Sequence, residues 1–503
     1  MTVRSILRWL GRSLLSLLSA LLLVGAGLYL HYLWAGPEIK PWHRARLTAE
    51  FTAADYEGGA VTTLAQYRAG EQRVLDQVRT EIMSRVEPRD RTIFNRFNPG
   101  SLSDPGAWDV DWNRTFVLEP PGEPVGGVLL LHGLTDSPYS LRSVGLALQG
   151  LGFRVVGLRL PGHGTAPSGL LTVEVEDLQA ATELAMRDLV ASLGGTKAVF
   201  IIGYSNGAAL AVNYALDARD DAELPQPAGL VLISPAIGIT RLAAIGRIRT
   251  GISDLQGFGR AAWQLIEPEL DPYKYQSFSF HAAGATQRLT SNLAKRVARL
   301  AEQGPVTGLP PILAFVSTVD STVQAPAVVD ALLGRLAADG HELVLFDVNR
   351  LAVVQPMLVA DPAPLTRRML AEPQRPFALT LVTNANSRTL EVKERRVPAG
   401  GVEATERLLD LAWPRNVFSL SHVALPFPPD DPLYGYAAAR TPRHIQLGSI
   451  EVRGENGVLN VPGWMLTRQR SNPFHRYLVE RIEEFVEHGT DVEAVRTAGG
   501  TAH

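Results

Sequence analysis

The stretch that decides the fold runs from Ala198 to Val212 and reads AVFIIGYSNGAALAV. It begins with a short apolar run typical of a buried strand, passes through GYSNG (203–207), and continues into small residues typical of a closely packed helix. This order of strand, G-x-S-x-G and helix is what a nucleophile elbow requires. Glycines relieve the crowding in so tight a turn, and the strained backbone holds the serine hydroxyl clear of the sheet. Ser205 is therefore the candidate nucleophile.

A second strand-to-helix turn lies about seventy residues upstream, where residues 128–138 read VLLLHGLTDSP. The helix is expected to open near Ser137, because serine caps helices and proline suits their first turn. The main-chain N–H of Leu134 would then point at Ser205 and form a two-donor oxyanion hole with the N–H of Asn206. Loss of one such donor typically costs about 10²–10³ in rate. The alternative is a buried strand that simply ends in a glycine turn.

Between these two motifs, residues 153–164 read FRVVGLRLPGHG, a short apolar strand followed by a glycine- and proline-rich loop. His163 is a candidate base, but it precedes Ser205, whereas hydrolases of this elbow type follow the order serine, acid, histidine. We interpret it as a histidine that structures the loop.

Together, LHGLTDSP (131–138), LRLPGHG (158–164) and GYSNG (203–207) resemble the α/β-hydrolase superfamily. The most similar branch holds monoacylglycerol lipases, carboxylesterases and serine aminopeptidases. The resemblance is specific over about 115–235 and looser over 310–425. It implies an α/β fold, a mostly parallel sheet flanked by helices, with an acid after a later strand and a histidine toward the C-terminal end.

Asp320 matches the acid position of that family, because it follows the strand-like run 311–317. Its role would be to accept the Nδ1 proton of the histidine and stabilise the imidazolium. The alternative role is an N-cap for a helix over 323–336. Asp347, at the end of the apolar run 343–346, is the second candidate acid.

His422 is the favoured base, because it ends a strand pattern at 416–421 and opens a proline-rich loop at 424–429. His444 is the next candidate, and His341 and His475 are the remaining ones after the acid. Positions 320 and 422 lie 102 residues apart, more than a plain hydrolase needs. The excess at about 348–415 predicts an added strand pair or an extended sheet edge.

Residues 14–33, LLSLLSALLLVGAGLYLHYL, form a 20-residue apolar stretch that is long enough to span a bilayer core. Arginines and lysines flank both ends, so the charge rule does not decide orientation. We expect a signal anchor with the catalytic domain on the extracytoplasmic side, the periplasm in a bacterium. The alternative is a signal peptide cleaved at the small residues 24–26.

These observations divide the chain into an anchor (1–35), a mostly helical lead-in arm (36–114), and a hydrolase core in two parts (115–237 and 309–490). A lid is expected between the two parts (238–308), with an apolar helical stripe through Leu289, Leu293 and Val297 and aromatic residues around Phe258 and Trp263. The second part of the core contains the insertion at about 348–415.

Composition excludes several other classes of protein. The chain has no cysteine, so it has neither disulfides nor a thiolate nucleophile, and a net charge of −3 gives no nucleic-acid footprint. The sequence contains no phosphate-binding loop, no dinucleotide fingerprint and no H-E-x-x-H metal motif. We therefore expect no cofactor, no metal and no nucleic-acid partner.

The leading hypothesis is a membrane-anchored serine hydrolase that cleaves carboxylic esters, lipidic or acyl in kind, through an acyl-enzyme. The second is an aminopeptidase-like amide hydrolase, which needs an acidic group for the substrate amine. Glu267, Glu269 and Asp271 are its candidates. The third is a non-catalytic binding protein on the same fold.

Overall fold

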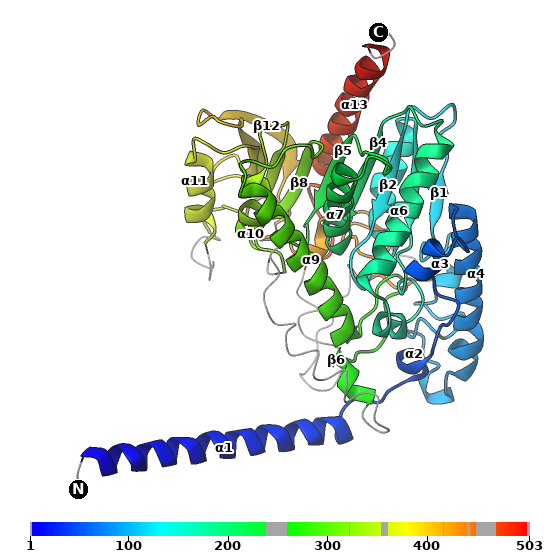
Figure 1. Ribbon diagram of the computed structural model, residues 1–503, viewed down its shortest axis with the longest axis vertical. Helices are drawn as coiled ribbons and strands as arrows, with labels where there is room; N and C mark the ends of the chain where they lie inside the picture. Colours follow the sequence, from blue (N-terminus) through cyan, green and yellow to red (C-terminus); the bar gives the residue numbers. More distant parts are fainter. Residues whose placement is uncertain are drawn as a thin grey trace.

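A computed structural model of the chain describes residues 3–237, 259–320, 322–353, 361–415, 417–439, 443–448 and 469–499. Its centre is a twisted ten-stranded sheet with helices on both faces (Figure 1). The strands follow the spatial order β1-β3-β2-β4-β5-β8-β9-β10-β11-β12. Their bounds are β1 Phe116–Leu118, β2 Gly126–Leu131, β3 Phe153–Leu158, β4 Val199–Tyr204, β5 Gly229–Ile233, β8 Ile312–Ser317, β9 Glu342–Phe346, β10 Ala378–Asn384, β11 Glu391–Val397 and β12 Thr405–Ala412.

Adjacent strands from β3 to β10 run parallel, whereas β1 is antiparallel to β3, and β11 is antiparallel to both β10 and β12. The mostly parallel sheet expected from the sequence is therefore present. A short hairpin of β6 (Trp263–Leu265) and β7 (Phe278–Ser279) lies outside it.

The helices and 3-10 turns connect the strands and cover the sheet. Their bounds are α1 Val3–Ala35, α2 Pro41–Arg44, α3 Ala53–Glu57, α4 Leu64–Glu81, η1 Met83–Arg85, η2 Pro88–Asp90, η3 Pro105–Ala107, η4 Pro138–Leu141, α5 Arg142–Gly150, η5 Pro167–Leu171, α6 Val175–Ser192, α7 Asn206–Asp220, η7 Gly259–Ala262, α9 Phe280–Ala301, α10 Ala325–Ala331, η8 Leu333–Arg335, α11 Ala363–Ala371, η10 His422–Ala424 and α13 His475–Gly499.

Two hydrophobic clusters make the core, one on each face of the sheet. Because side chains alternate along a strand, Leu129 and Leu131 of β2 face the cluster that contains α6, α7 and α9. Val128 and Leu130 face the other cluster, which contains α5 and α13. Both faces are thus buried, which explains why these strands read as continuous apolar runs.

The helical arm packs on the core through a buried polar network. The guanidinium of Arg159, which follows β3, is 1% exposed and pairs with Glu50 at 2.7 Å and Glu71 at 3.1 Å. The hydroxyl of Tyr67 in α4 donates to the carbonyl oxygen of Arg159 at 2.7 Å. An unpaired guanidinium buried this deeply would be costly, so these contacts fix the arm to the sheet.

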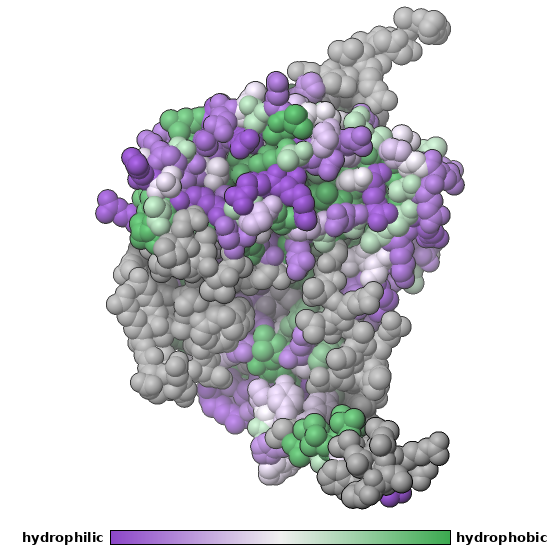
Figure 2. All heavy atoms as spheres, turned by 90° about the vertical axis from the view of Figure 1, so that its left-hand side faces the viewer, coloured by the Kyte–Doolittle hydropathy of each residue, from purple (hydrophilic) through white to green (hydrophobic). Residues whose placement is uncertain are grey.

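Helix α1 projects from the domain (Figure 1), and hydrophobic residues gather on it at the lower end of the face in Figure 2. Its section Arg12–Tyr32 is long and apolar enough to cross a membrane by length and composition, and none of that section is buried. It is the only such helix in the part of the chain that the structure describes.

One expectation needs correction. The described residues of the stretch 416–421 form no strand: β10 already pairs with β9, so the position beside β9 is occupied. Of the two forms expected for the insertion, the structure has the extended sheet edge, made of β10, β11 and β12.

The apolar stripe in the segment expected to form the lid packs against the core. Leu289, Leu293 and Val297 of α9 are buried in the cluster that contains α6 and α7, so this helix belongs to the helical layer of the core. Residues 238–258, including Phe258, lie outside the described residues. What lies between them and α9 is a cap segment, residues 259–279.

Candidate active site

Ser205 lies in the turn between β4 and α7, with a φ of 54°. This is the left-handed region, which a serine adopts only when its surroundings impose it. A Cβ on Gly207 would overlap the carbonyl oxygen of Leu131, and one on Gly203 would overlap the Cα of Ala208. The two glycines are therefore required by close packing of the turn against β2 and α7.

The side chain of Ser205 contacts His422, which in turn contacts Asp320. Nε2 of His422 lies 3.0 Å from Oγ of Ser205, and Nδ1 lies 2.8 Å from Oδ2 of Asp320. With Nδ1–H donating to the carboxylate, Nε2 is free to accept the serine proton. The structure thus brings together the three side chains that the sequence singled out.

Asp320 follows β8, and its two carboxylate oxygens have different partners. Oδ2 accepts from His422, while Oδ1 accepts the main-chain N–H groups of Thr322 at 2.8 Å and Val323 at 2.9 Å. Burial opposes the charge of Asp320, but the hydrogen bond and charge of His422 and the two N–H donors outweigh it and lower the pKa of the carboxyl. The N-cap of α10 is Gln324, so Asp320 does not cap that helix.

His422 reaches the elbow on an extended segment that crosses the carboxyl ends of β8 and β9. The hydroxyl of Ser317 donates to the carbonyl oxygen of Leu420 at 2.8 Å, and the N–H of Asn349 donates to that of Phe418 at 2.8 Å. The ring of Tyr204, inside the GYSNG motif, lies 5.5 Å from the ring of His422. These contacts, rather than a strand, place the histidine.

Leu134 and Asn206 occupy the positions expected for oxyanion donors. A Cβ on Gly133 would lie 3.3 Å from Cβ of Ser205, so the turn that carries the N–H of Leu134 is beside the serine. Asn206 is the first residue of α7, and the first N–H groups of a helix have no acceptor within it. The two residues expected as oxyanion donors therefore lie beside Ser205 in the fold.

Part of the chain is similar to known proteins. Residues 122–347 match the family model described as serine aminopeptidase, S33. The thermostable monoacylglycerol lipase of Bacillus sp. (strain H-257) is 27% identical over 246 residues, which are 46% of this chain and 87% of that protein.

Over residues 122–347, the chain is thus similar to the serine-hydrolase branch of the α/β-hydrolase superfamily.

Similar solved structures include two lipases. One is a monoacylglycerol lipase of Paleococcus ferrophilus, with 21% identity and a TM-score of 0.35 over 46% of this chain and 88% of that one. Another is a soluble variant of the monoglyceride lipase of Saccharomyces cerevisiae, with 15% identity and a TM-score of 0.37 over 46% of this chain and 82% of that one. The family match ends at position 347, so His422 and the three added strands of this hydrolase lie beyond it.

The other candidate histidines of the hydrolase have partners elsewhere. Nδ1 of His341 accepts the N–H of Ile312, His444 stacks on Trp108 with ring centroids 4.3 Å apart, and Nε2 of His475 lies 3.2 Å from Oγ of Ser143.

His163 is buried, and burial lowers its pKa to about 4. Its Nδ1 lies 2.8 Å from the carbonyl oxygen of Pro161, and its ring lies 5.1 Å from that of His132. These contacts are those of a histidine that structures its loop.

Asp347, the second candidate acid, is buried beside β10 and does not contact His422. Its carboxylate accepts from Arg350 at 2.8 and 2.9 Å and from the hydroxyl of Thr383 at 2.8 Å. Its partners therefore hold the end of β9 against the added strand.

Two of the candidate amine-binding acids are engaged inside the cap segment. Glu269 accepts the N–H groups of Gln276 at 3.1 Å and Ser277 at 2.8 Å. Asp271 accepts the N–H of Tyr273 at 2.9 Å and the hydroxyl of Tyr434 at 2.6 Å. Both carboxyls are buried, so neither is open to a substrate amine.

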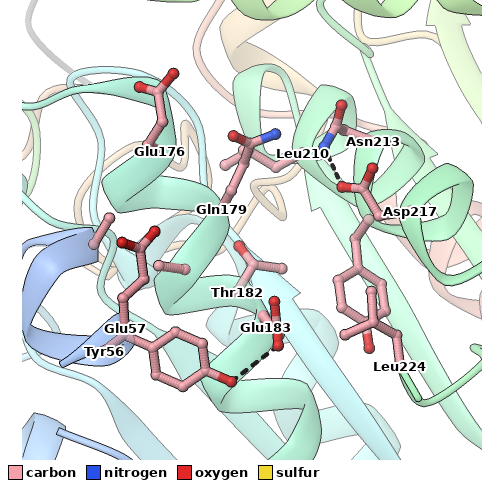
Figure 3. A pocket seen from close by; sticks show the side chains of 13 residues that line it. Tyr56, Glu57, Glu176, Gln179, Thr182, Glu183, Leu210, Asn213, Asp217 and Leu224 are labelled. Atoms are coloured by element: carbon pink, nitrogen blue, oxygen red, sulfur yellow. Dashed lines mark hydrogen bonds between the residues drawn. The ribbon is translucent and has the colours of Figure 1, made fainter. Parts of the chain in front are cut away.

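A cavity of about 290 Å³ lies on the helical side of the hydrolase, between α3, α6 and α7 (Figure 3). Tyr56 donates to Glu183 and Asn213 to Asp217 on its walls. It contains none of the residues that meet at Ser205. The lining residues are Ala53, Tyr56, Glu57, Glu176, Gln179, Ala180, Thr182, Glu183, Leu210, Asn213, Tyr214, Asp217 and Leu224.

Proposed function

We propose that this hydrolase cleaves carboxylic esters, lipidic or acyl in kind, through an acyl-enzyme on Ser205. The observation that carries the proposal is the hydrogen-bonded series Ser205–His422–Asp320, with separations of 3.0 and 2.8 Å. The first separation lies within the range in which a base takes a proton from a nucleophile, and the second is a hydrogen bond that orients the base.

In the first half of the proposed reaction, Oγ of Ser205 attacks the acyl carbonyl while Nε2 of His422 takes the hydroxyl proton. The negatively charged oxygen of the tetrahedral intermediate accepts hydrogen bonds from the N–H groups of Leu134 and Asn206. Asp320 stays ionised and stabilises the imidazolium. The intermediate then collapses, the ester C–O bond breaks, and His422 gives its proton to the leaving alcohol.

In the second half, water attacks the acyl-serine while His422 takes a proton from it. Collapse of the second intermediate returns that proton to Oγ of Ser205 and releases the carboxylic acid. All bonds and protons balance with ester and water as the two reactants, so the proposed reaction needs no cofactor.

Two features support a lipidic substrate and a membrane location. The relative from Bacillus is named a monoacylglycerol lipase, and α1 has the length and composition of a membrane span. We place α1 in the bilayer as a signal anchor and the hydrolase domain on its extracytoplasmic side. The aminopeptidase alternative is not better supported: Glu269 and Asp271 are engaged with the main chain, and half-buried Glu267 is the candidate that remains for it.

The proposed nucleophile is tested with a fluorophosphonate label and a panel of p-nitrophenyl esters and aminoacyl anilides. Ser205→Ala should abolish labelling and ester turnover, because Oγ of Ser205 is the hydroxyl that contacts His422. Ser234→Ala is the matched control: Ser234 directly follows the neighbouring strand β5 and has a positive φ of 44°, and this variant should still be labelled at Ser205. Labelling that persists in Ser205→Ala would overturn the proposal.

A further inference from the structure

The cap segment contains a tight turn, residues 269–277, that is built around its own buried acids. The carboxylate of Glu269 receives N–H groups from the end of the turn, and that of Asp271 receives the N–H groups of Tyr273 at 2.9 Å and Lys274 at 3.1 Å. The two buried acids thus satisfy four main-chain N–H groups of the turn from inside it. The turn is therefore a rigid unit rather than a loose loop.

Tyr275 projects from this rigid turn into the loop that follows β3. Its side chain is buried, and its hydroxyl donates to the carbonyl oxygen of Gly162 at 3.1 Å and accepts the N–H of Thr165 at 2.7 Å. The Arg96 guanidinium lies 5.5 Å from the ring centroid. The hydroxyl thus satisfies two main-chain groups of the LRLPGHG loop at once.

The main chain of the same residue holds the loop that follows β2. The N–H of Tyr275 donates to the carbonyl oxygen of Thr135 at 2.7 Å, and Thr135 has a φ of 64°. The ammonium of Lys274 lies 3.6 Å from the carboxylate of Asp136, which is 1% exposed. Thr135 immediately follows Leu134, so the turn binds the main chain two peptide units after the N–H of the proposed oxyanion donor.

We infer that Tyr275 is a positioning residue for the oxyanion loop. It ties three segments distant in sequence (the cap turn, the loop after β2 and the loop after β3) so that the N–H of Leu134 is held toward Ser205. The inference rests on the proposed function, because it concerns how well that N–H meets a tetrahedral intermediate.

The physical reason is that oxyanion stabilisation depends on donors fixed before the reaction. A left-handed residue such as Thr135 persists only where its surroundings over-determine it. Without the tyrosine hydroxyl, the N–H of Thr165 and the carbonyl of Gly162 lose buried partners, and the turn loses its register with the loop after β3. Tyr275 touches neither His422 nor Ser205, so proton transfer itself should be unaffected.

The test compares Tyr275→Phe with Tyr273→Phe in the full chain held in detergent micelles. Tyr273 is the matched control, since it is buried in the same turn, but its hydroxyl donates to the carbonyl oxygen of Val110 at 3.3 Å instead of to the loop after β3. Tyr275→Phe should lower kcat for p-nitrophenyl acetate about tenfold with KM changed less than about twofold. Affinity for an alkyl boronic acid, whose serine adduct places an oxygen in the oxyanion hole, should fall by a similar factor.

Hydrogen exchange separates this inference from the proposed reaction. Tyr275→Phe should speed amide exchange in residues 133–137 and 162–165, and Tyr273→Phe should not, whether or not esters are the substrate. Faster exchange without any ester turnover by the wild type would overturn the proposed function and leave the positioning role. If Tyr275→Phe raised only KM, or left kcat and exchange unchanged, the positioning role would be overturned.

Lys274→Gln provides a second variant if Tyr275→Phe does not fold, since Lys274 is partly exposed and its loss leaves the turn's main-chain bonds in place. It should lower kcat by about twofold to threefold and speed exchange of residues 133–137. Wild-type values of both kcat and amide exchange would contradict the inference that the cap turn holds the loop after β2 in place.

Discussion

At the scale of single residues, a position with no regular secondary structure supplies the proposed base. His422 is buried in a short 3-10 turn and is held by contacts on both ring nitrogens. The ring cannot turn away without breaking its hydrogen bond to Asp320, which would leave Oδ2 of a buried carboxylate without that partner. Its orientation is therefore set by the same contacts through which it would move protons.

Replacing His422 with Ala should lower kcat/KM for p-nitrophenyl esters by about 10⁴-fold or more, since loss of the base leaves only the oxyanion donors and substrate binding. His163→Ala should change kcat/KM less than about tenfold, but should destabilise the fold by about 2 kcal/mol, because it empties a buried site. Steady-state kinetics and thermal unfolding of both variants check this. The opposite ranking in kcat/KM would make His163 the base.

The residues of the candidate site differ in how clearly the sequence indicates them. Ser205 lies in a local motif, and Asp320 follows a buried strand, so local patterns pointed to both. His422 was chosen from several histidines by its proline-rich surroundings. No local sequence pattern indicates the positioning role of Tyr275, because its partners Thr135 and Gly162 are more than a hundred positions away in the chain.

At the scale of elements, three added strands lengthen the chain between the proposed acid and base without separating them in space. β10 joins the sheet beside β9, and β11 and β12 extend that edge. Buried Glu342 of β9 accepts the hydroxyl of Thr380 at 2.6 Å and pairs with Arg396 of β11 at 3.2 Å and Arg481 of α13 at 3.1 Å. It links the original sheet to the addition.

The strand expected over 416–421 is absent for a physical reason. Val417 and Leu420 are buried, but they lie three positions apart and Phe418 is 44% exposed, so burial does not alternate as in a half-buried strand. They pack instead in the cluster that holds α13, while the main chain bonds to Asn349 and Ser317 at strand ends. A sequence pattern reports which side chains are buried, and it does not report whether a sheet edge is free.

The cap turn should make stability depend on pH through Glu269. Burial raises the pKa of this carboxyl from 4.5 to about 7. The folded state therefore holds its proton at a pH where the unfolded chain has lost it. The resulting contribution is fully present below about pH 4.5 and is lost as pH rises toward 7, by about 3 kcal/mol in all.

Glu269→Gln should remove this part of the pH profile, because the amide does not titrate. Its free energy of unfolding should lie below that of the wild type at pH 5, since an amide accepts fewer of the turn's N–H groups, and should approach the wild-type value at pH 8. Denaturant unfolding between pH 4.5 and 8 measures both curves, with the exposed Glu176→Gln on α6 as the control. Parallel curves for wild type and Glu269→Gln would contradict the assignment.

At the scale of the whole molecule, the segment after α1 is part of the folded domain. Lys40 pairs with Asp90 at 2.8 Å, Ile39 packs beside Trp263, and the guanidinium of Arg260 donates to the carbonyl oxygen of Pro37 at 2.6 Å. The domain therefore begins at about residue 36 rather than at α2. The residues that follow α1 contact the cap segment, and the cap segment contacts the loop that carries Leu134.

A chain that begins at Gly36 should therefore be soluble, keep the contacts of Ile39 and Lys40, and cleave short esters at the rate of the full protein. A chain that begins at Pro41 should unfold at a lower temperature, because it leaves Asp90 and the Trp263 cluster without these partners.

The full chain should fractionate with membranes and resist extraction with alkaline carbonate, since an apolar helix is held in the bilayer by burial rather than by charge. A mature protein that starts near Gly27 and appears in the soluble fraction would show that the apolar segment is a cleaved signal. That result would remove the membrane support for a lipidic substrate, whereas the contacts among Ser205, His422 and Asp320 would be unchanged, since all three lie in the folded domain.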